Sequence, residues 1–240
     1  MIDLHLKKLR RRDDIGPQEE KFIRGLVSRT VMLPADKVII RAGDALHESL
    51  MLFSGWMARA KDLPSGQRQY AELHVPGDFA DLHSYSLKRL DHDVISFTPC
   101  VVGVVPHERL DEMTQKFPHL TRIYWFQTNL DAAIHREWTL SMGRRTAVAR
   151  MAHLFCELLI RLDIVGMTTG RLSYDFPLTQ IELGECLGLT GVHVNRTLQD
   201  LRRQGLIQLE SRRVEILDLD GLKAVAEFDD TYLYLEKMKH

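Results

Sequence analysis

Residues 179–207 of the chain read TQIELGECLGLTGVHVNRTLQDLRRQGLI, and this stretch predicts two short helices joined by a tight turn. Thr179 and Glu182 have the spacing of a capping box, in which the threonine hydroxyl accepts from a first-turn N–H and the glutamate reaches back. Gly188 can adopt the left-handed conformation that reverses the chain, and Gly184 leaves room for a close approach of the second helix. The stretch is therefore interpreted as a helix-turn-helix.

The second helix has one apolar and one polar face. Val194, Leu198 and Leu201 repeat at helical spacing and predict its buried side. A helix whose N-terminus enters the major groove of DNA brings its positive dipole end to the phosphates, and Asn or Arg in its first turns can bond base edges. The DNA-binding residues predicted in this motif are Thr179, Gln180, Thr190, Gly191, His193, Asn195, Arg196, Gln199, Arg202 and Arg203.

Two short apolar runs follow, at 207–209 and 214–217, and they predict a hairpin wing. Arg212 and Arg213 between them are expected to touch the DNA backbone. The chain has a net charge of −1, but residues 191–213 hold five arginines against two acids. Such focused positive charge is typical of a DNA-reading element, although a solvated charged helix gives a similar count. A purely structural helical hairpin is the alternative for the whole segment.

The N-terminal half predicts many short antiparallel strands. Turn-forming glycines recur at Gly43, Gly55, Gly66 and Gly77, and a short helix with Pro17 in its first turn precedes them. Such spacing indicates a small sandwich or barrel. The apolar or alternating runs expected to form strands are 38–40, 50–53, 56–60, 70–75, 94–97 and 101–105.

The helical period returns after Pro106, and the longest helix is expected at about 118–141. Its apolar residues lie three and four apart, as in a coiled-coil seam that Glu137 interrupts. It is either a dimer helix or a helix lying on its own domain. Gly143 is interpreted as a hinge between a domain at 1–142 and one at 143–240. The predicted dimer interface is Ile123, Phe126, Leu130, Ala133 and Leu140.

Composition excludes several classes of protein. The 240 residues are 45% hydrophobic and 27% charged, as in a globular protein, and no apolar run has the length of a membrane span. A cytoplasmic, unprocessed chain is expected. Cys100, Cys156 and Cys186 form no CxxC pair, so neither a disulfide nor a cysteine-ligated metal is expected.

No catalytic motif of the GxSxG, Walker, HExxH or Cys/His nucleophile type occurs, and the chain is not expected to be an enzyme. The alternative to a DNA-binding regulator is a stand-alone ligand-binding or protein-interaction module, whose C-terminal helices would bind a partner other than DNA.

The segments 178–180, 188–190, 192–198 and 205–207 resemble the helix-turn-helix of the Crp/Fnr family of bacterial regulators. The resemblance spans nearly the entire chain. It implies an α+β protein with an N-terminal antiparallel β-roll sensor domain similar to cyclic-nucleotide-binding domains, a long dimerisation helix and a C-terminal winged helix-turn-helix. Such a protein is expected to bind double-stranded DNA as a homodimer at two-fold related half-sites, with RNA polymerase left open as a further partner.

The reading helix matches the family only in part. Arg196 matches the arginine that reads guanine in the family, whereas Gly191 and Val192 stand where the founding member has an arginine and a glutamate. The half-site sequence therefore cannot be copied from that member.

The sensor region departs further from the family. Members that bind cyclic AMP have a Gly-Glu turn and then an Arg with small residues, whereas this chain has Gly77-Asp78-Phe79 and later Asp91 and Asp93. Cyclic AMP is therefore not expected as effector, and the effector is unknown. An iron–sulfur cluster is excluded by the cysteine count, and a haem on one of His74, His83 or His92 is left open. The residues proposed for an effector pocket are Gly77, Asp78, Lys88, Arg89, Trp125 and Trp138.

Overall fold

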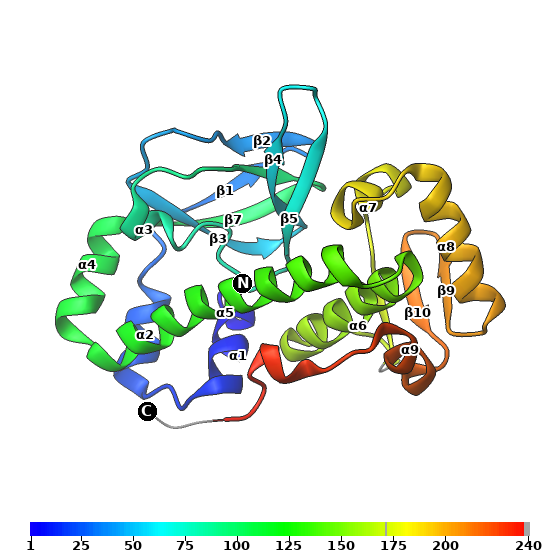
Figure 1. Ribbon diagram of the computed structural model, residues 1–240. Coiled ribbons are helices and arrows are strands. Elements are labelled where there is room, and N and C mark those ends of the chain that lie inside the picture. The colour runs from blue at the N-terminus through cyan, green and yellow to red at the C-terminus, as the bar shows by residue number, and fades with distance from the viewer. Residues whose placement is uncertain (171, 238–240) are drawn as a thin grey trace.

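The computed structural model describes residues 1–170 and 172–237. Figure 1 shows a β-roll on one side, a helical domain with a hairpin on the other, and the long helix α5 running across both. The predicted α+β architecture is confirmed. In chain order the elements are α1 (Asp3–Arg12), α2 (Pro17–Arg24), β1 (Arg29–Leu33), β2 (Lys37–Ile40), β3 (Glu48–Ser54), β4 (Met57–Asp62), β5 (Arg68–His74), α3 (Ser84–Leu87), β6 (Asp93–Ser96), β7 (Cys100–Pro106), α4 (His107–Lys116), α5 (Pro118–Arg144), α6 (Ala147–Val165), β8 (Ser173–Asp175), α7 (Gln180–Leu187), α8 (Gly191–Arg203), β9 (Ile207–Glu210), β10 (Arg213–Ile216), α9 (Leu219–Ala226) and the 3₁₀ helix η1 (Asp230–Leu233).

The β-roll is made of two antiparallel sheets, with strand orders β1-β7-β3 and β2-β6-β4-β5. Inward-facing side chains such as Leu52, Met57 and Val102 fill the space between them. Gly55 turns the chain between β3 and β4 with φ +91°, and a Cβ there would lie 2.5 Å from the Pro99 carbonyl oxygen. Each predicted strand is present; β1 was missed because it is short and mostly exposed, with Met32 82% exposed.

Helix α1 was not predicted from the sequence. Its basic residues suggested only charge, yet Leu6 and Leu9 are fully buried in an apolar cluster that also contains Ile23 of α2 and Ile123 of α5. Helix α1 also packs against α6, so the N-terminus contacts the C-terminal half of the chain.

Helix α5 continues through Gly143, where a break was predicted, and ends at Arg144. Thr146 then caps α6, since its side chain accepts from the Ala149 N–H. A Cβ on Gly143 would meet nothing within 4 Å, so this glycine lies in an ordinary exposed helical position. The chain therefore changes direction at Arg145 and Thr146. The domain boundary between residues 142 and 143 stays a prediction.

One apolar core joins the β-roll to the C-terminal domain. It contains Trp56 and Phe97 from the roll, Trp138 from α5 and Phe155 from α6. Trp56 meets Phe176 edge to face, with ring centroids 6.2 Å apart. The two parts are thus packed together, not merely linked by a helix.

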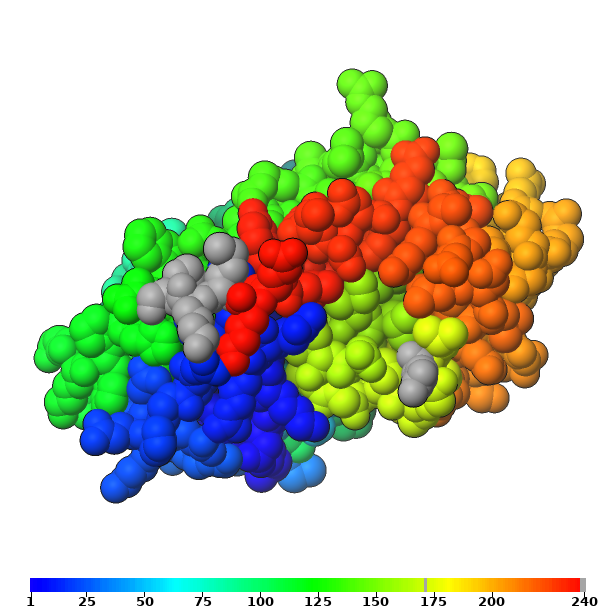
Figure 2. All heavy atoms as spheres, turned by 90° about the horizontal axis from the view of Figure 1, so that it is seen from below, coloured from blue at the N-terminus to red at the C-terminus, as the bar shows by residue number. Residues whose placement is uncertain are grey.

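The C-terminal segment closes the far side of the molecule. After α9 it passes through η1, which contacts α5, and returns to the N-terminal helices, as Figure 2 shows in red between green and blue. The Tyr232 hydroxyl donates to Glu157 at 2.9 Å, and Arg12 of α1 donates to the Glu236 carbonyl oxygen at 2.8 Å. None of the helices in 1–170 and 172–237 combines the length and apolar character needed to cross a lipid bilayer.

Candidate nucleic-acid interface and sensor cavity

The turn between α7 and α8 has the predicted geometry. The Glu182 N–H donates to the Thr179 hydroxyl at 3.2 Å, and the Thr179 N–H donates to the Glu182 carboxylate at 2.6 Å, which completes the capping box. Gly188 is left-handed with φ +62°. A Cβ on Gly184 would lie 2.5 Å from the Leu189 carbonyl oxygen, so the turn folds back tightly on α7. The Thr190 hydroxyl caps α8 by accepting from the His193 N–H.

Helix α8 buries one side and exposes the other. Val194, Leu198 and Leu201 lie in the core, as predicted. The outward residues are Gly191, Val192, His193, Asn195, Arg196 and Gln199. The Gln199 side-chain amide donates to Asn195 Oδ1 at 3.0 Å. Within the described residues, no hydrogen bond or ion pair engages the side chain of His193 or Arg196, so both are available to an external ligand.

The wing is a β-hairpin whose two strands are joined by a two-residue turn. Ser211 and Arg212 join β9 to β10 with φ +50° and +60°, which is the pattern of a type I′ turn. Arg212 is exposed at the tip. Arg213 was also predicted to touch the DNA backbone, but it is the first residue of β10. Its guanidinium donates to Ser173 Oγ at 2.7 Å and to Asp175 at 3.3 Å, so it points toward β8.

The remaining predicted residues fall into two groups. Thr179 and Gln180 are exposed at the start of α7. Arg202 donates to the Leu209 carbonyl oxygen, and Arg203 pairs with Asp200. These two arginines are thus bonded within their own domain, and Arg196 and Arg212 are the arginines of this surface whose side chains have no partner among the described residues.

Val192 was noted in the sequence only for its difference from the founding member and was left out of the predicted DNA-binding residues, yet its side chain is 70% exposed on the outward face of α8. Ile181 on α7 is similarly exposed, at 71%. The signal was present in the sequence, because positions two residues from a buried Val194 lie on the opposite side of a helix.

The residues proposed for an effector pocket do not come together. Trp125 is 66% exposed on the outer face of α5, whereas Trp138 is buried and donates from Nε1 to Glu157 at 3.1 Å. Lys88 lies over the Tyr85 ring, and Arg89 donates to the Gly43 carbonyl oxygen. The proposal of a shared pocket is wrong, because the two tryptophans face opposite sides of α5 and the two cations are held at the surface.

Asp78, in the turn after Gly77, is buried in a structural ion cluster. Lys8 of α1 lies 2.7 Å from its carboxylate and Arg161 of α6 lies 2.9 Å from it. Burial alone would raise the pKa of Asp78, but these two cations hold it below its usual range. Arg161 also binds Glu157 at 3.0 Å. The acid of this turn therefore joins the β-roll to α1 and α6.

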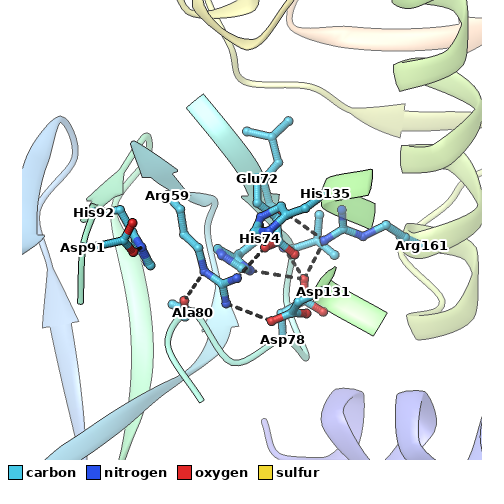
Figure 3. Close-up of polar contacts among 12 residues, drawn as sticks. Arg59, Glu72, His74, Asp78, Ala80, Asp91, His92, Asp131, His135 and Arg161 are labelled. Atoms are coloured by element: carbon cyan, nitrogen blue, oxygen red, sulfur yellow. Dashed lines mark hydrogen bonds and ion pairs between the residues drawn. The ribbon is translucent and has the colours of Figure 1, made fainter. Parts of the chain in front are cut away.

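Arg59 of β4 occupies the centre of a second buried network (Figure 3). Its guanidinium binds Glu72 at 2.5 Å, Asp131 of α5 at 2.9 Å and the Ala80 carbonyl oxygen at 2.9 Å. His135 of α5 lies 3.0 Å from the same Glu72 carboxylate. Burial would raise the pKa of Glu72, but Arg59 and the neighbouring histidines hold it well below the usual value. Burial and the charge of Glu72 raise the pKa of Asp131 to about 6.

A cavity of about 360 Å³ lies beside this network, between the β-roll and α5. We call it the sensor cavity. It is lined by Arg59, Lys61, Ala71, His83, Asp91, His92, Thr128, Asp131, Ala132 and His135.

The residues of the sensor cavity do not fit a cyclic nucleotide. The arginine and the lysine that line it among the described residues are already paired, Arg59 with Glu72 and Asp131, and Lys61 with Asp91 at 2.8 Å, so a phosphate would have to compete with carboxylates for them. They do not fit a haem either, because charged side chains replace the apolar walls that a macrocycle needs. His74, the third candidate ligand, is buried and lies 3.9 Å from Asp78 instead. The three cysteines are buried and lie apart, on β7, α6 and α7.

The predicted dimer seam faces inward. Ile123 and Ala133 are buried in the chain's own core, and Phe126 packs on Arg12 and Tyr234. Leu130 is half-buried, and only Leu140 is exposed. The prediction is wrong for the buried side chains, because the apolar side of α5 covers its own β-roll and α6. A second stripe of α5 is exposed, and its members are again three and four residues apart: Pro118, Arg122, Trp125, Asn129, Ala132, Arg136, Thr139 and Gly143. Leu140 and Arg144 are exposed beside this stripe.

Comparisons with known proteins agree with this architecture. A family model described as a cyclic nucleotide-binding domain matches residues 30–117, and one described as a Crp-like helix-turn-helix domain matches residues 149–225. The transcriptional activator protein FnrL of Cereibacter sphaeroides is 31% identical over 200 residues, which are 82% of this chain and 79% of the relative. A probable transcriptional activator of Rhizobium leguminosarum bv. viciae is 33% identical over 175 residues, 72% of this chain and 70% of the relative.

A solved structure has the same fold. That of FixK2 from Bradyrhizobium japonicum superposes with a TM-score of 0.76 at 22% identity, over 83% of this chain and 98% of that one. The β-roll, the long helix and the winged helix-turn-helix define a class of sensor-linked transcription regulators. The chain belongs to the Crp/Fnr family and is a DNA-binding regulator of that type. The alternative of a stand-alone module without DNA binding is therefore not retained.

Proposed function

We propose that the protein is a cytoplasmic homodimer that reads a pseudo-palindromic operator with α8, under the control of an effector other than cyclic AMP. The observation that carries this proposal is the outward face of α8. It presents Arg196, whose side chain has no partner within residues 1–170 and 172–237, next to a helix N-terminus that favours phosphate. RNA polymerase contact stays a prediction.

Arg196 is assigned to a guanine. An arginine in the first turns of a reading helix can bond both O6 and N7 of that base. Arg196→Ala should lower specific affinity by about 1–3 kcal/mol and relax the preference at one G·C pair in each half-site. Selection from random duplexes measures both effects, and Arg41→Ala on the β-roll is the matched control. Unchanged discrimination by Arg196→Ala would assign guanine reading to another residue.

Arg212 is assigned to the phosphate backbone. Arg212→Ala should weaken binding to all duplexes alike and reduce the slope of log affinity against log salt by about 2, since the dimer loses one phosphate contact from each protomer. Arg213→Ala should act through the position of the wing, because Arg213 is bonded to Ser173 and Asp175. An effect of Arg212→Ala on one sequence alone would contradict the backbone assignment.

The two protomers are proposed to meet along the exposed stripe of α5. Its members repeat every three and four residues, the spacing that keeps a seam on one side of a helix. Ala132 lies near the middle, so Ala132→Arg should give monomers in sedimentation, whereas Ala42→Arg on an exposed loop should not. A dimeric Ala132→Arg variant would place the interface elsewhere.

The effector is proposed to act at the sensor cavity, through contacts of the Arg59 network with α5. This network joins β4 and β5 to Asp131 and His135 on the proposed dimer helix. A ligand that changed these pairings would change the position of α5 relative to the β-roll. The paired cations favour a ligand that is not a cyclic phosphate.

A further inference from the structure

Val192 is an exposed apolar residue that lies among the side chains assigned to base reading. It is 70% exposed, although the other valine of the helix, Val194, is fully buried. A large apolar side chain exposed on a polar helix face gains free energy when a partner removes it from water. Its neighbours His193, Asn195 and Arg196 are polar and exposed, so the partner of this face must offer polar groups with an apolar one among them.

The position of Val192 on the helix aligns it with Arg196. At 3.6 residues per turn, the two side chains are about 40° apart around the axis, and both lie roughly opposite Val194. Four residues at 1.5 Å each separate them by about 6 Å along the helix. Base pairs stack 3.4 Å apart, so Val192 falls within about two base pairs of the guanine assigned to Arg196.

Val192 also lies at the end of α8 that enters the groove first. It is the second residue of the helix, after Gly191, and a Cβ on Gly191 would meet nothing within 4 Å. Gly191, which precedes Val192, thus adds no side chain at this end of the helix. Among the groups on the major-groove edge, the apolar one is the C5 methyl of thymine.

We propose that Val192 is a specificity-determining residue that packs on the C5 methyl of a thymine within about two base pairs of the Arg196 guanine. This inference rests on the proposed function of α8. It gives each half-site a T·A pair at a position where a glutamate in place of Val192 would accept from the N4 amino group of cytosine. A glutamate at this position would thus select cytosine through a hydrogen bond, whereas Val192 selects thymine through contact with its methyl group.

Replacement of single thymines by deoxyuridine tests the proposal, because it removes the methyl group and leaves every base-pairing group in place. The operator is first obtained by selection from random duplexes with the full-length protein. Each thymine of a half-site is then replaced in turn, and affinity is measured by fluorescence anisotropy. One replacement near the Arg196 guanine should weaken wild-type binding about fourfold, the loss expected for one buried methyl group.

Substitutions of Val192 are then combined with the deoxyuridine replacement in a double-mutant cycle. Val192→Ala should bind the thymine and deoxyuridine operators with nearly equal affinity, whereas Val192→Ile should keep the preference for thymine. Ile181→Ala is the matched control, since Ile181 is equally exposed but lies on α7, outside the reading face. Selection with Val192→Glu should recover cytosine in place of the thymine.

The outcomes separate this inference from the proposed function. Equal wild-type affinity for thymine and deoxyuridine at every position would overturn the role of Val192, and so would an unchanged penalty in Val192→Ala. In either case a guanine preference that depends on Arg196 would still support the reading helix. Absence of sequence-specific binding to any duplex would overturn the proposed function itself.

Discussion

His5 is a residue through which we expect the stability of the fold to depend on pH. It is buried between the β-roll and α5, where Nδ1 lies 2.8 Å from the Gly77 carbonyl oxygen and Nε2 lies 3.0 Å from the Tyr124 hydroxyl. A carbonyl oxygen only accepts, so Nδ1 carries the proton and the tyrosine donates to Nε2. Burial lowers the pKa of His5 to about 4 and keeps the ring neutral.

The sign of the pH effect follows from this shift. The unfolded chain protonates His5 near pH 6.5, so between about pH 4 and 6.5 it binds more protons than the folded chain, and stability falls as the pH is lowered. His5→Gln should flatten this dependence by up to about 1.4 kcal/mol per pH unit. Urea unfolding at pH 5, 6 and 7 measures the slope, with His193→Gln as an exposed control. Parallel curves for His5→Gln and the wild type would contradict the assignment.

Among the elements, those set by local rules could be predicted from sequence. The α7–α8 turn depends on Thr179, Gly188 and Thr190, and each acts within a few residues of its own position. The strands of the β-roll follow from turn glycines in the same way. Helix α1 and the inward seam of α5 could not be found, because periodicity identifies an apolar face without telling whether its partner is the same chain or a second copy.

The ion pairs in and beside the sensor cavity could not be predicted, because their members are far apart in the sequence. Arg59, Glu72 and Asp131 come from three elements, and nothing in their spacing along the chain indicates that they meet. The Gly77-Asp78 turn was recognised, but its acid is used by Lys8 and Arg161, which are remote in sequence. The outward residues of α8 could be predicted because one helix face determines them.

Two glycines on neighbouring elements should respond oppositely to alanine. At Gly184 an added methyl group would lie 2.5 Å from the Leu189 carbonyl oxygen, so the turn must move, and Gly184→Ala should cost about 1–3 kcal/mol. At Gly143 the space within one protomer is open and the backbone is helical, so Gly143→Ala should stabilise by about 0.5–1 kcal/mol when it is made in the Ala132→Arg variant, which removes the proposed dimer contact. Urea unfolding compares the two variants at equal protein concentration. A loss of stability in Gly143→Ala would restore the predicted break in α5 at that residue.

On the scale of the whole molecule, the β-roll and the DNA-binding domain share one interior. The apolar core runs from Trp56 through Trp138 to Phe176, and the C-terminal segment returns to α1 along the opposite side. Packed apolar side chains, as well as α5, therefore connect the β-roll to α8. Because buried contacts join the two parts, we expect one cooperative unfolding transition, with equal calorimetric and van't Hoff enthalpies.

Arg161 is the polar centre of that shared interior and should control its cooperativity. It joins Asp78 of the β-roll to Glu157 of α6 and donates to the Leu73 carbonyl oxygen at 2.6 Å. Arg161→Met would leave Glu157 buried without its cation and Asp78 with Lys8 alone, so it should cost about 3–5 kcal/mol. Because this stability is lost at the contact between the β-roll and the DNA-binding domain, the single calorimetric transition should broaden or divide. Arg41→Met, on an exposed loop, should leave the wild-type profile unchanged. A sharp single transition at the wild-type temperature in Arg161→Met would mean that apolar packing alone couples the β-roll to the DNA-binding domain.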